Sequence, residues 1–162
     1  MRIICYALLA LAPLLVACTS DEPAPTGETA RAESTAAEEA PTGLPRTASP
    51  EGARVFFISP ADGETVSNPV RVVFGIEGMT VVPAGDDTHH SGHHHLLIDT
   101  DLPDPGLPIP KDDRHVHFGD GSTETEITLE PGEHTLQLML GDHLHIPHDP
   151  PVTSEQITIS VE

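Results

Sequence analysis

Short runs in which apolar and polar residues alternate fill the chain from residue 51 to residue 162, and this period of two is typical of β-strands. Turn-forming segments separate the runs, and none of them has a sustained helical period. We therefore predict seven main strands and one short edge strand, at residues 54–59, 70–76, 79–82 (the edge strand), 94–100, 115–118, 123–129, 134–140 and 153–161. So many short strands in about 110 residues predict an all-β fold, an immunoglobulin-like β-sandwich.

The first 17 residues are typical of a signal peptide, because Arg2 precedes an apolar run that is shorter than the roughly 20 residues needed to span a bilayer. Residues 15–18, Leu-Val-Ala-Cys, resemble the bacterial lipoprotein processing box. The resemblance implies cleavage before Cys18 and lipidation of that residue; the alternative is an ordinary secretory signal with an incidental cysteine. Thr19 follows the cysteine in place of an aspartate, which favours the outer membrane, facing the periplasm or the cell surface.

Residues 18–50 are predicted to form the lipidated Cys18 and a disordered acidic linker. The segment is rich in Pro, Ala, Thr, Ser and Glu, and Leu44 is its only large aliphatic residue. Such a composition buries too little apolar surface to offset the entropy lost on ordering. We therefore expect a bacterial envelope protein that is attached to the membrane by its lipid anchor, with one folded domain at residues 51–162.

Acidic residues dominate this domain, which contains 20 of them against four basic residues. This charge excludes nucleic acid as a partner and disfavours docking on anionic lipid. It suits cations, although acidic surfaces also serve solubility alone.

All eleven histidines of the chain fall between His89 and His148. Six of them lie in three pairs with i, i+2 spacing, at residues 93/95, 115/117 and 143/145, and on a strand such pairs share one face about 6.5 Å apart. Imidazole is the commonest side-chain ligand for zinc and copper. The predicted metal ligands are His93, His95, His115, His117, His145 and His148.

Strand phase and topology predict how these rings gather. Leu96 and Ile98 share a face with His94, which leaves His93 and His95 together on the opposite face. The third and sixth main strands of such a sandwich are antiparallel neighbours, so residues 93–95 should approach residues 143–148. We expect the long loop 101–114 to run back, so that residues 115 and 117 reach the same end.

Several histidines also have an interpretation without a metal. His134 follows a Pro-Gly turn and is predicted to be a hydrogen-bonded residue at a strand entry. His94 is equally well explained as a buried histidine with satisfied hydrogen bonds, and His89 and His90 as solvated loop residues. For His148 the alternative is a role in bracing a turn.

The ion is predicted to be Cu(II) or Zn(II), with Ni(II) as a further alternative. The mature domain has no cysteine, which argues against a blue-copper centre, and only two methionines, which argues against a Cu(I) carrier. Imidazole together with carboxylate suits the divalent ions.

The histidine motifs together resemble the domain-of-unknown-function 4399 family, an exported bacterial family without an established activity. The motifs that carry the likeness are Gly-His-His-His-Leu-Leu-Ile-Asp at 92–99, Pro-Ile-Pro at 108–110, His-Val-His-Phe-Gly at 115–119, His-Thr-Leu-Gln-Leu at 134–138 and His-Ile-Pro-His-Asp-Pro-Pro at 145–151. This resemblance implies a shared histidine site but no reaction. His143, His89 and His90 fall outside the pattern.

Residues 115–120 are also similar to the copper-ligand strand of copper/zinc superoxide dismutases. The chain lacks the disulfide of those enzymes and a counterpart of their active-site arginine, and a short local match does not determine function. We therefore do not expect an enzyme.

Two hypotheses compete: a metal-binding envelope lipoprotein that buffers, senses or delivers the ion, and a metal-free immunoglobulin-like module that binds an envelope protein or glycan. Convergence of the predicted ligands distinguishes them.

Overall fold

The computed structural model describes residues 43–162, and all its regular elements are β-strands. These are β1 (Arg54–Ser59), β2 (Thr65–Val66), β3 (Val70–Glu77), β4 (Thr80–Val81), β5 (Ser91–Ile98), β6 (His115–His117), β7 (Glu124–Ile127), β8 (Gly132–Gly141) and β9 (Ile157–Val161). Across residues 43–162 there is no helix long and apolar enough to cross a membrane. The predicted signal peptide, Cys18 and most of the predicted linker lie outside the described residues.

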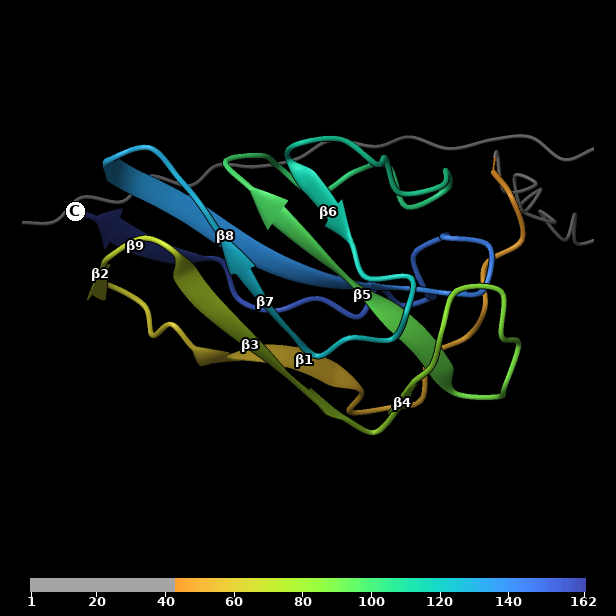
Figure 1. The fold of residues 1–162 in the computed structure, drawn as a ribbon. Helices are drawn as coiled ribbons and strands as arrows, with labels where there is room; N and C mark the ends of the chain where they lie inside the picture. The colour runs from red at the N-terminus through yellow and green to blue at the C-terminus, as the bar shows by residue number, and fades with distance from the viewer. Residues whose placement is uncertain (1–42) are drawn as a thin grey trace, which may run out of the picture. The chain divides into compact units, whose positions relative to one another are not determined.

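The strands form two sheets that face each other (Figure 1). The smaller sheet has the antiparallel order β1-β3-β7. The larger has the order β2-β9-β8-β5, and both β4 and β6 pair with β5. The predicted all-β sandwich is confirmed, while its immunoglobulin-like topology stays a prediction. The sequence analysis missed β2, because two residues are too few to show alternation.

β5 is buried along its whole length because side chains cover both of its faces. On the face toward the smaller sheet, Leu96 joins the main core with Leu136, Leu138 and Leu140 of β8. On the opposite face, Leu97 packs in a second, smaller cluster. The central position predicted for this strand is therefore confirmed, and the histidines of β5 are held by two layers of packed side chains.

The packed part of the chain begins before the predicted boundary at Glu51. The amide of Leu44 donates to the carbonyl of Gly106 at 3.1 Å, and the amide of Ser49 donates to the carbonyl of Asp149 at 3.0 Å. Figure 1 shows this segment in orange beside the blue loop that follows β8. Composition could not reveal the contact, because the partners of Arg46, Thr47 and Ser49 lie about a hundred residues later in the chain. Residues 44–49, which the composition assigns to the linker, thus lie against the sandwich.

His134 ties the entry of β8 to the end of β5. Its Nδ1 lies 2.7 Å from Oδ2 of Asp99, and its Nε2 lies 2.8 Å from the carbonyl oxygen of Glu130. Both partners accept hydrogen bonds, so both ring nitrogens donate and the ring is an imidazolium. The hydrogen bond to Asp99 raises the pKa of His134 above its usual value. The structure thus agrees with the predicted hydrogen-bonding role of His134.

We expect the substitution Asp99→Asn to lower the pKa of His134, measured by NMR titration of its ring protons. The amide keeps an oxygen for the amide proton of Thr135, which Asp99 accepts at 2.8 Å, but it removes the charge. In the wild type the raised pKa stabilises the fold fully below about pH 6.5, and this contribution is lost as the pH rises through the folded-state value. Asp101→Asn is the matched control, and an unchanged titration in Asp99→Asn would refute the ion pair.

Candidate metal centre

His93 and His95 form the centre of the candidate site. They lie two residues apart on β5, so they share the face that carries Leu97, and neither is exposed to solvent. Their ring centroids are 4.9 Å apart, and their Nε2 atoms are 3.1 Å apart. The predicted pairing of these two rings on one face is therefore what the structure has.

His117 enters from the neighbouring strand β6. β6 runs antiparallel to β5 and places His117 directly opposite His95, with ring centroids 5.1 Å apart. The ring centroid of His117 is 5.0 Å from that of His93. One nitrogen from each of the three rings lies within 4.8 Å of the others, an arrangement that can hold a metal ion.

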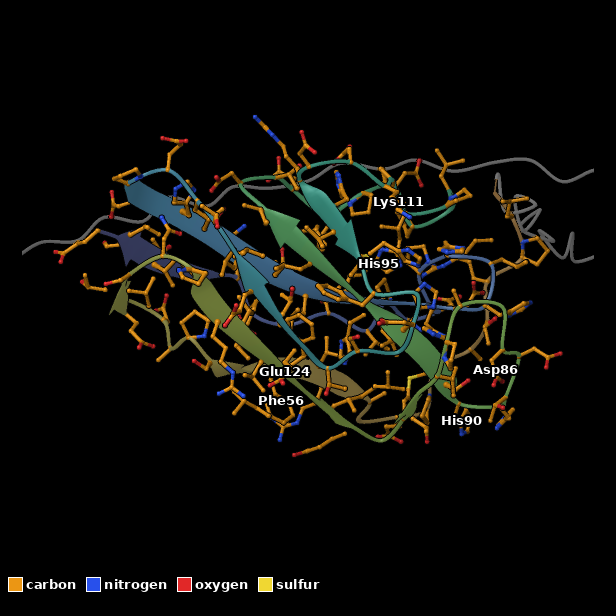
Figure 2. The ribbon with its side chains drawn as sticks, viewed as in Figure 1. Phe56, Asp86, His90, His95, Lys111 and Glu124 are labelled. Atoms are coloured by element: carbon orange, nitrogen blue, oxygen red, sulfur yellow. The ribbon has the colours of Figure 1, made fainter. Side chains whose placement is uncertain are left out.

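His145, on the loop after β8, lies beside this group of three. Its Nε2 is 3.1 Å from Nε2 of His117, and its ring centroid is 4.9 Å from that of His93. Four imidazoles around a tetrahedral ion with metal–nitrogen bonds of 2.0–2.1 Å would have their nitrogens roughly 3.3 Å apart. The two closest nitrogen pairs, His93/His95 and His117/His145, are near that spacing. Figure 2 shows His95 beside this loop.

The loop that carries His145 is organised by the buried carboxylate of Asp142. One oxygen, Oδ1, accepts the amides of Leu144 at 2.8 Å and of Ile146 at 3.0 Å. The amide of His145 donates to the carbonyl of Asp142 at 2.9 Å, and His145 has a left-handed φ of 65°. Burial raises the pKa of Asp142, but hydrogen bonds from Ile146 and Thr47 outweigh burial and leave it below its usual value. A negative charge therefore lies next to the imidazoles.

Two glycines give the rings the space they occupy. A Cβ at Gly119 would lie 2.3 Å from Cε1 of His117, and one at Gly141 would lie 2.9 Å from Nε2 of His95. Any side chain at either position would therefore displace a ring of the candidate site. The sequence analysis quoted Gly119 as part of a motif but gave it no role, and it missed Gly141 and Asp142; glycine next to the histidine runs was the available signal.

The rings of His93, His95 and His117 are held in their neutral form. Burial, assisted by the neighbouring His145 and His117, lowers the pKa of His93 to about 4. Burial and the neighbouring His93 lower that of His95 to about 2, and burial lowers the pKa of His117 as well. A metal ion binds only the unprotonated imidazole, so these rings are ready to coordinate at neutral pH.

His115 lies outside the group, contrary to the prediction. Its Nδ1 is 2.8 Å from Oδ1 of Asp112, and its register partner on β5 is Leu97. The loop 101–114 does reach the site, where Ile109 donates to the carbonyl of His145 at 2.7 Å. It then returns, so that β6 begins at the far end of β5 and only His117 arrives at the group.

His148 also lies apart, on the other face of the larger sheet. Its Nε2 is 3.0 Å from the position that a Cβ of Gly92 would take, and Gly92 shares the face of His94. Its Nδ1 is 3.2 Å from the carbonyl oxygen of Thr47. His148 thus contacts a segment about a hundred residues earlier in the chain, which neither the metal-ligand prediction nor the alternative of bracing a turn described.

The remaining histidines are not part of the group. The ring of His94 is buried and lies 5.1 Å from that of Phe74 in the main core, but contrary to the alternative interpretation neither of its nitrogens has a partner among residues 43–162. His89 is exposed and its ring lies against that of His90, 3.6 Å between centroids. In Figure 2, His90 lies well away from His95.

We expect His117→Ala to weaken binding of Zn(II) strongly and His115→Ala to leave it nearly unchanged. The first change removes a converging nitrogen, whereas the second removes a ring held by Asp112. Isothermal titration calorimetry on the two variants measures the difference. An equal loss of Zn(II) affinity in the two variants would show that His115 is a ligand after all.

The family model described as "Domain of unknown function (DUF4399)" matches residues 72–162. The match covers more than half of the chain and includes the three converging histidines and His145. No curated protein and no solved structure matches the chain.

Proposed function

Since the chain belongs to the DUF4399 family, whose name assigns no activity, we propose its function from the site: an envelope lipoprotein that binds Cu(II) or Zn(II) through His93, His95, His117 and His145. The single observation that supports this proposal is the convergence of three imidazoles, from His93, His95 and His117, with the ring of His145 beside His117. The group has two fully buried members and two partly buried ones.

The chemistry of the donors favours a divalent ion of intermediate softness. Imidazole nitrogens suit zinc and copper, and the mature domain offers no thiolate. The carboxylate of Asp142 and the acidic surface favour a cation. The buried Nε2 atoms of His93 and His95 lie 3.1 Å apart, so one ion could bind both of them.

The number of ligands favours binding over catalysis. With His145 as the fourth ligand beside the three converging rings, a tetrahedral ion would have no open position for water or a substrate, whereas catalytic zinc keeps one. We therefore propose that the protein buffers, senses or delivers the ion. The lipid anchor at Cys18 would hold the domain at a membrane of the bacterial envelope, the outer membrane being the location that Thr19 favours.

Elemental analysis of the full chain, purified without an affinity tag, tests the proposal. We expect one copper or zinc ion per chain, and isothermal titration calorimetry of the metal-free protein should give one tight site for Cu(II) or Zn(II). A protein that binds neither ion would overturn the proposal and leave the metal-free interaction module as the better hypothesis.

A further inference from the structure

We infer that residues 44–49, called the strap here, are a positioning element of the metal site: the strap holds the loop that carries His145, so that strap docking and ion binding strengthen each other. This inference rests on the proposed function. It adds residues outside the family match, which begins at residue 72, and a means of regulation.

Arg46 holds the far end of the loop. Its Nε donates to the carbonyl of Pro147 at 3.0 Å, and one terminal nitrogen donates to the carbonyl of His148. The other terminal nitrogen forms an ion pair with Asp149 at 3.2 Å. Backbone carbonyls are two of the three acceptors, so Arg46 fixes the course of the chain just after His145.

Thr47 holds the near end through Asp142. Its hydroxyl donates to Oδ2 of Asp142 at 2.8 Å, while the other oxygen of the same carboxylate accepts the amides of Leu144 and Ile146. The carbonyl of Thr47 also accepts the amide of Asp149 at 2.9 Å. The side chain and the backbone of one strap residue thus contact both ends of the loop.

The loop needs this support because His145 has a left-handed φ of 65°, which L-residues seldom adopt. If the strap left, the loop would lose these contacts and could relax. Nε2 of His145 would then move away from His117. Coupling between two binding events is reciprocal: the ion must favour the docked strap by the same factor by which the strap favours the ion.

The strap lies near the C-terminal end of the predicted linker, residues 18–50, so it would connect the proposed membrane anchor to the metal site. Ion affinity is then highest with the strap docked, and a partner that captures residues 44–49 would release the ion. This gives a delivery protein a means of unloading at the membrane.

The test uses the full chain and Zn(II), with affinity measured by competition against a chelator. We expect Thr47→Val, which keeps the shape and removes the donor, to weaken binding about tenfold, within the usual range for coupled sites. Thr47→Ser keeps the hydroxyl and should restore the wild-type affinity. Ser49→Ala is the matched control, because its hydroxyl donates to the carbonyl of Pro150 and does not contact Asp142.

Hydrogen exchange supplies the reciprocal measurement. Zn(II) should slow the exchange of the Ser49 amide, which donates to Asp149, in the wild type but not in His117→Ala. Wild-type affinity in both Thr47→Val and Arg46→Ala, or strap exchange that does not respond to Zn(II) in a protein that binds it, would overturn the inference alone. A wild type that binds no zinc and no copper would overturn the proposed function and the inference together.

Discussion

Replacing both His93 and His95 with alanine should abolish tight binding of Cu(II) and Zn(II) while the fold survives. The two rings supply two of the three converging nitrogens and are the two members with no exposure to solvent. Loss of an outer-shell partner of a metal ligand costs roughly 10- to 100-fold in affinity, and loss of two direct ligands should cost more than that. Titration calorimetry on the double variant should show no tight site.

The fold should tolerate this change because both rings are poorly satisfied. Each has an Nδ1 without a partner among residues 43–162, so its removal relieves an unsatisfied polar group as well as leaving a cavity. The face they occupy is separate from the main core, which contains Leu96 and its neighbours on β8. Circular dichroism and urea unfolding would report the fold independently of the ion.

His94→Ala is the matched control for the double variant. It removes the same ring from the same strand but on the opposite face, next to Phe74. Both nitrogens of this ring also lack a partner among residues 43–162, but the ring packs in the main core, so we expect this variant to lose stability and to keep its metal affinity. If His94→Ala lost the ion while the double variant kept it, the site would be assigned to the wrong face of β5.

The end of the sandwich at which the rings meet could be predicted from the alternation of residues along a strand and from one rule of strand pairing. Alternation fixed which residues of β5 share a face, because Leu96 and Ile98 had to point into a core. Antiparallel pairing of the third and sixth main strands then brought residue 93 opposite residue 141. These steps need only the period of a strand and the order of the sheets.

The rest of the site depends on features that have no periodic signal. The position of His117 depends on the 16-residue loop between β5 and β6. The path of so long a loop cannot be predicted from its composition. His145 depends on a turn closed by one carboxylate, Asp142, and on hydrogen bonds from residues 44–49. Residues 44–49 have the polar composition of a linker, and for this reason they were predicted to belong to the linker.

The metal-free domain should lose much of its stability as the pH falls from 7 to 5. Burial is the main cause that lowers the pKa of His93 and of His94 to about 4 and that of His95 to about 2. In the unfolded chain each of these rings titrates near 6.5. Below that pH the unfolded state therefore binds protons that the folded state does not, and the equilibrium shifts toward unfolding.

The sign and the size of this effect follow from linkage. Stability from a group with a lowered pKa is fully present above pH 6.5 and is lost as the pH falls toward the folded-state value. One such group changes the free energy of unfolding by up to about 1.4 kcal/mol per pH unit. Three groups should together remove roughly 3 to 5 kcal/mol between pH 7 and pH 5, a large part of the 5–15 kcal/mol typical of a domain.

Urea unfolding of chelator-treated protein at pH 7, 6 and 5 measures this loss directly. His94→Leu replaces one of the three rings with an apolar side chain of similar size and leaves the metal site untouched, so its stability should fall by about a third less over the same range. The opposite trend of the Asp99–His134 pair, whose contribution is retained as the pH falls, cannot compensate for three buried rings. A free energy of unfolding that stayed constant from pH 7 to pH 5 would mean that the rings of β5 are reached by water, and the closed, neutral histidine group would have to be abandoned.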